Sequence, residues 1–98
     1  MSQKIEPAHA GTLESSDAFV RVMPNAFAGI EIELESSVAE LYGDAIEVLV
    51  LQTVQAMQVE HVKVIIQDKG ALDYVIKARV QTALLRAMGL NEPDWSTL

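Results

Sequence analysis

Apolar and charged residues alternate strictly between Ile30 and Glu35, where three aliphatic residues are interleaved with Glu31, Glu33 and Glu35. Successive side chains of a β-strand point to opposite faces, so this pattern predicts a strand with one aliphatic and one acidic face. Residues 62–67 are rich in β-branched side chains and predict a second strand. Residues 12–14 and 18–23 are interpreted as two more strands, joined by a polar turn at 15–17.

Residues 37–56 are predicted to form a helix. Ser37-Val38-Ala39-Glu40 fits a capping box, and Gly43, which costs about 1 kcal/mol relative to alanine, allows a kink or a restart at Asp44. Helical spacing divides the segment into an apolar and an acidic side. The predicted core side is Val38, Leu41, Tyr42, Ala45, Leu49 and Ala56, and the acidic side is Glu40, Asp44 and Glu47. Leu51 and Val54 fall near the acidic side, which indicates either wide burial or a partner contact.

Residues 71–88 predict the second helix, which ends at Gly89 and cannot continue past Pro93. Its core stripe is Leu72, Ile76, Val80, Ala83, Leu84 and Ala87. Arg79 and Arg86 share one side of this helix and are interpreted as a solvated flank or a partner contact.

The predicted fold is α+β, a two-layer sandwich with a mixed sheet and two helices in the order β-β-β-α-β-α. Residues 1–98 form a single domain, with a loose leader at 1–10 and a tail at 91–98 that contains Trp95. The end of the leader could form an edge strand. The strand-helix-strand unit between residues 30 and 67 should place its two strands parallel and be right-handed.

Composition narrows the function classes. With no cysteine, the chain has no thiol nucleophile and no cysteine-ligated zinc. Without a membrane-length apolar run or a signal-peptide core, the expected location is cytoplasmic. The net charge is −7, which disfavours nucleic acid as a partner. Nine acidic residues and one basic residue lie between positions 14 and 60. This acidic segment is interpreted either as a solvated surface or as a surface that docks basic partners.

Candidate chemistry is sparse. His9 and His61 lack metal-ligand spacing, so no metal site is predicted, and the three glutamates of the alternating strand are best explained as a solvated row. Ser15 and Ser16 lie in a polar turn, and nothing nearby would ionise either hydroxyl. A serine that the chain cannot activate is better interpreted as one that another enzyme modifies.

The segment Gly11-Thr12-Leu13-Glu14-Ser15-Ser16-Asp17 resembles the prosthetic-group motif of the citrate lyase acyl carrier protein, the gamma subunit of that complex. The resemblance continues through Val20-Arg21-Val22, Gly43-Asp44-Ala45-Ile46, Asp68-Lys69-Gly70-Ala71-Leu72-Asp73, Ala78-Arg79 and Pro93-Asp94-Trp95. The resemblance covers nearly the whole chain. The two long motifs, residues 11–17 and residues 68–73, together make it specific.

This resemblance implies a non-catalytic carrier whose Ser15 holds a covalent 2'-(5''-phosphoribosyl)-3'-dephospho-CoA group, attached by a prosthetic-group transferase. The alpha subunit would exchange acetyl for citryl on the thiol of this arm, and the beta subunit would cleave the citryl thioester to oxaloacetate. Ser16 is the neighbouring rival, but Ser15 aligns with the family's acceptor. Alternatives are the malonate decarboxylase carrier subunit, an acidic interaction module without a prosthetic group and, last, a small enzyme that uses glutamate.

Overall fold

Four strands and two helices make up the computed structural model, which describes residues 5–27, 29–36 and 39–89. The elements are β1 (Ala8–Gly11), β2 (Ala18–Met23), β3 (Ile30–Ser36), α1 (Ala39–Ala56), β4 (Val62–Asp68) and α2 (Asp73–Ala87). Their order, β-β-β-α-β-α, and the mixed sheet confirm the predicted fold class.

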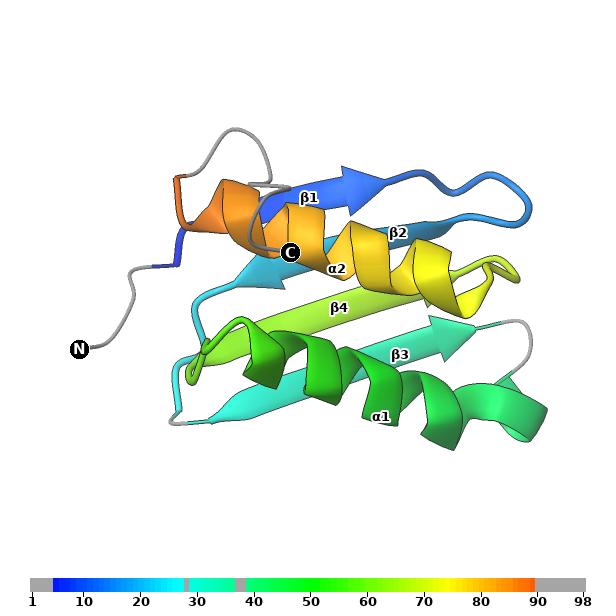
Figure 1. Ribbon diagram of the computed structural model, residues 1–98, viewed down its shortest axis with the longest axis horizontal. Helices are drawn as coiled ribbons and strands as arrows, with labels where there is room; N and C mark the ends of the chain where they lie inside the picture. The colour runs from blue at the N-terminus through cyan, green and yellow to red at the C-terminus, as the bar shows by residue number, and fades with distance from the viewer. Residues whose placement is uncertain (1–4, 28, 37–38, 90–98) are drawn as a thin grey trace.

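The sheet has the strand order β1-β2-β4-β3. β2 pairs antiparallel with both β1 and β4, whereas β3 runs parallel to β4, as predicted for the strand-helix-strand unit. Both helices lie on one face of the sheet, with α1 beside β3 and α2 over β1 and β2 (Figure 1). The starts of both helices and the turn between β1 and β2 therefore lie at the same end of the molecule.

The core lies between the sheet and the helices. Alternate residues of β2 and β4 point into it, and α2 contributes nearly all of its predicted stripe. The fully buried side chains include Val20, Val22, Val64, Ile66, Ile76, Val80 and Leu84. Leu72 is the exception from the predicted stripe: it precedes the helix and is 62% exposed.

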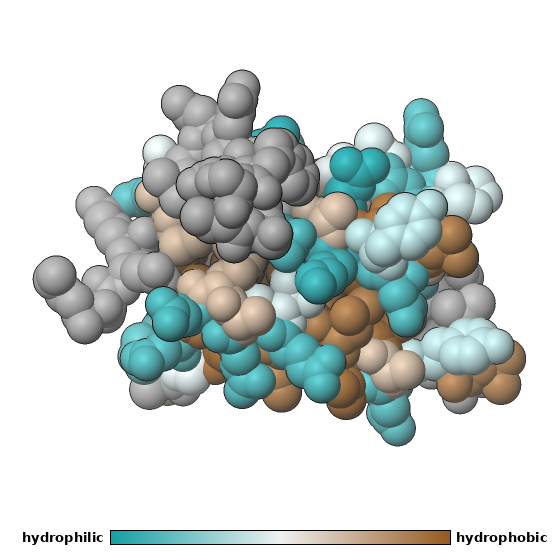
Figure 2. All heavy atoms as spheres, viewed as in Figure 1, coloured by the Kyte–Doolittle hydropathy of each residue, from teal (hydrophilic) through white to brown (hydrophobic). Residues whose placement is uncertain are grey.

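The predicted core side of α1 was wrong. The buried residues are Ile46, Val50, Thr53 and Val54, a set rotated by about a quarter turn from the predicted one. Leu41 and Tyr42 are exposed, and brown spheres lie at the helix starts at the right of Figure 2. Val, Leu and Ile residues occur on every side of this helix, so periodicity could not locate the side that faces the sheet. It continues through Gly43, and the proposed capping box at 37–40 lies outside the described side chains.

The N-terminal prediction also needs correction. The edge strand considered at the end of the leader exists as β1, whereas the strand predicted at 12–14 is part of the turn. Thr12 Oγ1 accepts a hydrogen bond from the Glu14 N–H (3.2 Å), which folds the backbone away from an extended course. The described part of the leader is not loose, because Ile5 is buried and the Glu6 N–H donates to the Ala87 carbonyl (2.9 Å).

Candidate functional site

Ser15 and Ser16 are the two central residues of a tight turn that the Asp17 N–H closes onto the Glu14 carbonyl (3.2 Å). Ser16 has φ +66°, and a positive φ at the third residue alone is the type II pattern. Both serine side chains are exposed. Within the described residues, no hydrogen bond involves the Ser15 hydroxyl. The turn therefore presents a free hydroxyl at its corner.

Asp17 fastens this turn to α2. Arg79 donates from Nε to Oδ1 (2.9 Å) and from Nη2 to Oδ2 (3.1 Å) of the carboxylate. Thr12 Oγ1 donates to Oδ2 (2.6 Å), and the Ala18 N–H donates to Oδ1 (2.7 Å). These donors, the Arg79 guanidinium first and the Thr12 hydroxyl second, lower the pKa of Asp17 from 3.8 to about 2. Asp17 thus remains ionised and bonded at neutral pH.

Gly11 allows the turn to begin close to the start of β2. Its φ is +92°, and a Cβ there would lie 1.9 Å from the Ala18 carbonyl oxygen. Any side chain would collide with the backbone at this point. Gly11 and Asp17, the first and last residues of the segment 11–17, are therefore structural, since they shape and anchor the loop that carries Ser15.

The second long motif, residues 68–73, packs against the first, residues 11–17. The Ser16 N–H donates to the Lys69 carbonyl (2.8 Å), and the Lys69 N–H donates to the Asp17 carbonyl (2.9 Å). Asp68, 2% exposed, accepts from Ser36 Oγ (2.7 Å) and from the Ala71 N–H (2.9 Å). Residues about fifty positions apart in sequence thus form one rigid support for the serine turn.

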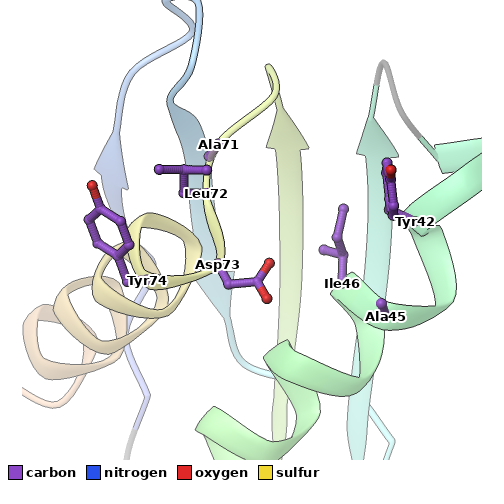
Figure 3. A pocket seen from close by; sticks show the side chains of 7 residues that line it. All are labelled: Tyr42, Ala45, Ile46, Ala71, Leu72, Asp73 and Tyr74. Atoms are coloured by element: carbon purple, nitrogen blue, oxygen red, sulfur yellow. The ribbon is translucent and has the colours of Figure 1, made fainter.

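A cleft of about 680 Å³ opens beside this support, between the starts of α1 and α2. Tyr42, Ala45 and Ile46 of α1 line one side, and residues 71–74 line the other. Figure 3 shows the Tyr42 and Tyr74 rings on opposite sides of the opening, with Asp73 between the helices.

Arg79 and Arg86 differ in their surroundings: Arg79 is half-buried, whereas Arg86 is exposed, as predicted for a solvated flank. Arg79 holds Asp17, and Arg86 Nη1 donates to the His9 carbonyl of β1 (2.9 Å). The sequence spacing of the two arginines did not reveal the contact of Arg79 with Asp17. A signal was available, because Arg79 lies three residues after Ile76 and four before Ala83, at the edge of the buried stripe.

The remaining candidates are dispersed. His61 Nδ1 accepts from the Gly29 N–H (3.0 Å) at the opposite end of the sheet from the serine turn. Glu31 and Glu33 form ion pairs with Lys63 (3.4 and 2.9 Å) on the sheet face away from the helices, and these carboxylates, Glu33 first, raise the pKa of Lys63. In the described part of the chain, no group of three or more acidic or histidine side chains could hold a metal ion.

The described site is thus an exposed Ser15 hydroxyl at the corner of a turn that Gly11 and Asp17 anchor. The model of the family described as the malonate decarboxylase delta subunit, an acyl carrier protein, matches residues 5–87. The fold agrees. A chain of a Pseudomonas malonate decarboxylase hetero-tetramer superposes with a TM-score of 0.71 at 18% identity, over 88% of each chain.

Curated relatives narrow the class. A citrate lyase acyl carrier protein of Vibrio cholerae is 54% identical over 94% of both chains. That of Klebsiella pneumoniae is 47% identical over the full length of both chains, and a second carrier of Salmonella typhimurium is 48% identical over 96% of this chain and 97% of its own. The chain belongs to the citrate lyase acyl carrier protein family.

The carrier role follows from this membership. Neither helix in the described residues is both long and apolar enough to cross a lipid bilayer.

Proposed function

We propose that this chain is the carrier subunit of a citrate lyase, with 2'-(5''-phosphoribosyl)-3'-dephospho-CoA joined through its phosphate to Ser15. The observation that carries the proposal is the exposed Ser15 hydroxyl at the corner of a turn that Gly11 and Asp17 anchor. A transferase that forms a phosphodiester needs a reachable hydroxyl, and a carrier needs a root that does not move with the arm. The residues present fit both requirements.

This chain holds and positions the arm. The group supplies a thiol at the end of a long flexible chain, and the protein contributes no cysteine that could compete for its acyl group. The support at Ser15 keeps the arm within reach of enzyme subunits that bind the carrier, which raises the effective concentration of the acyl group at their sites. In this proposal Ser15 would hold the arm where the alpha and beta subunits can reach its thiol, and those subunits would perform the acyl transfer and the cleavage.

The Ser15 assignment is tested by intact-mass spectrometry of the chain co-expressed with its prosthetic-group transferase system. We expect the wild type to gain the mass of the phosphoribosyl-dephospho-CoA group and Ser15→Ala to gain none. Ser16→Gly is the matched control, because glycine adopts the positive φ of this position and keeps the backbone hydrogen bond to Lys69. It should be modified as the wild type is.

Two results would contradict the proposal. Modification that survives Ser15→Ala and disappears in Ser16→Gly moves the attachment to the neighbouring residue. Absence of any mass gain, under conditions in which the Klebsiella pneumoniae relative is modified, favours the acidic interaction module.

A carrier subunit of malonate decarboxylase is the second candidate, because the matching family model has that description. The identities of 47–54% to citrate lyase carriers favour the first. Reconstitution separates the two. The modified chain should support citrate cleavage with citrate lyase alpha and beta subunits and should not support malonate decarboxylation with malonate decarboxylase subunits.

A further inference from the structure

Exposed apolar side chains are concentrated at one end of this molecule. Seven large hydrophobic residues in the described chain are exposed, and five of them belong to α1 or to the start of α2. These five are Leu41 (79% exposed), Tyr42 (57%), Val48 (52%), Leu72 (62%) and Tyr74 (70%). We call them the helix-start surface. Scattered exposed apolar residues are normal, but a group of this kind marks an interaction site.

The helix-start surface includes residues of both helices. Leu41, Ala45 and Val48 are spaced i, i+4 and i+7 and form a stripe on the solvent side of α1. Tyr42 leads from this stripe into the cleft, and Leu72 and Tyr74 border the cleft on the other side (Figure 3). The space-filling view shows brown and pale spheres at the right-hand end, where both helices start (Figure 2). A shallow cleft between two projecting aromatic rings suits a protruding apolar side chain of a partner.

The charge beside the stripe is negative. α1 contains three acidic residues and no basic one. Asp44 and Glu47 are exposed, and their positions place them along the edge of the stripe away from α2. Asp73 is exposed within the cleft, and Lys77, one turn further along α2, is the nearest base on that helix. An apolar surface with an acidic border matches a partner whose apolar patch has a basic border.

The location of this surface connects it with Ser15. Leu72 follows Lys69 by three residues, and Lys69 is bonded through its backbone to Ser16 and Asp17. We propose that the helix-start surface docks an enzyme subunit of the complex through an apolar patch bordered by lysine or arginine. This inference rests on the proposed carrier function. Docking here places a partner's active site beside the root of the arm.

A second copy of this chain is a poorer occupant, because it would bring two acidic borders together within a dimer of net charge twice −7. The arm itself is also a poorer occupant. It could enter the cleft, but it would leave the stripe of Leu41, Ala45 and Val48 uncovered on the outer side of α1.

The test measures binding of the unmodified chain to purified citrate lyase alpha and beta subunits by biolayer interferometry. We expect Leu41→Ser combined with Tyr74→Ser to raise the Kd for at least one subunit tenfold or more. Phe27→Ser is the matched control. Phe27 is also 79% exposed, but it lies between β2 and β3, at the far end of the sheet from Ser15. Its replacement should change the Kd less than twofold.

A charge variant tests the acidic border. Asp44→Lys combined with Glu47→Lys should raise the Kd tenfold or more at 50 mM salt and by a smaller factor at 300 mM, because salt screens exposed charges. Far-ultraviolet circular dichroism checks that each variant is folded.

Other outcomes overturn the docking proposal. A Kd that is unchanged in the Leu41 and Tyr74 double variant overturns it, and so does an equal loss of affinity in Phe27→Ser. A dimer of the isolated wild type that the double variant dissociates, seen by light scattering, assigns the surface to a second copy. If chemical shifts of residues 41, 42 and 74 move on modification and not on addition of subunits, the surface belongs to the arm. Because the chain is unmodified in the binding assay, loss of docking leaves the Ser15 mass gain intact, whereas failure of the carrier function removes that gain.

Discussion

Asp17 makes hydrogen bonds to residues on every side of the turn that carries Ser15. It accepts from the side chains of Thr12 and Arg79 and from the backbone of Ala18, while its own backbone pairs with Glu14 and Lys69. Its ionised form is favoured by Arg79 and Thr12, which together lower its pKa to about 2. The orientation of the turn that carries Ser15 therefore depends on one carboxylate.

We predict that Asp17→Asn destabilises the protein by about 1–2 kcal/mol at pH 7. The fall in pKa from 3.8 to about 2 corresponds to roughly 2 kcal/mol, which solvent reduces because Arg79 is 39% exposed. The folded-state pKa lies below the unfolded value, so this stability is present above pH 3.8 and is lost as the pH falls towards 2. Urea unfolding of both proteins between pH 7 and pH 2 should show the difference between them shrinking below pH 4.

Glu14→Gln is the control for this prediction, since it removes a charge from the same turn without touching Arg79. It should leave the free energy of unfolding within about 0.5 kcal/mol of the wild type. A difference between wild type and Asp17→Asn that stays constant down to pH 2 would show that the carboxylate is not stabilised by ionic contacts.

Gly11→Ala is predicted to destabilise the protein by about 2 kcal/mol or more in urea unfolding, because its Cβ would lie 1.9 Å from the Ala18 carbonyl oxygen. Gly70→Ala separates steric collision from backbone strain. Gly70 has a similar φ of +86°, but among the described residues beyond its two chain neighbours no atom lies within 4 Å of its added Cβ. The Gly70→Ala substitution should lower the free energy of unfolding by about 1 kcal/mol. Equal costs at the two positions would mean that the backbone moves to relieve the collision at Gly11.

For individual strands and helices, the sequence pattern predicted the buried face correctly where the two faces of the element differ in composition. β3 alternates aliphatic and acidic residues, and its predicted bounds differ from the observed ones by one residue. α2 has polar residues on its outer side, so five of its six predicted stripe residues are buried. α1 has Val, Leu or Ile on every side, and there the predicted face was wrong.

The side of α1 that faces the sheet can be tested by unfolding. Val50→Ala removes methyl groups from a side chain with no exposed surface and should destabilise the protein by about 1–3 kcal/mol. Leu41→Ala shortens a side chain that is 79% exposed and should change stability by less than about 0.5 kcal/mol. Urea unfolding measures both changes. A larger loss of stability in Leu41→Ala than in Val50→Ala would support the core face that periodicity predicted.

At the scale of the whole molecule, the fold gathers the two long motifs at one end. The turn between β1 and β2 and the loop between β4 and α2 meet because β2 and β4 are antiparallel neighbours, with Ala18 opposite Asp68. β3 runs parallel to β4, which brings the start of α1 to the same end. The proposed attachment residue and the proposed docking surface thus lie at the same end of the molecule, and His61 and Phe27 lie at the other end.

Local patterns were enough to predict the order of the elements, the parallel pairing of β3 with β4 and the turn that carries Ser15. These features follow from periodicity, turn chemistry and the helix that connects β3 to β4, and they need no knowledge of which other elements touch. Three features became visible in the folded chain alone: Arg79 binds Asp17 across 62 residues, Lys69 supports the serine turn, and Leu41 and Tyr42 face solvent. Contacts of this kind depend on how the helices rotate when they pack on the sheet, and a helix with aliphatic residues on every side, such as α1, does not encode that rotation locally.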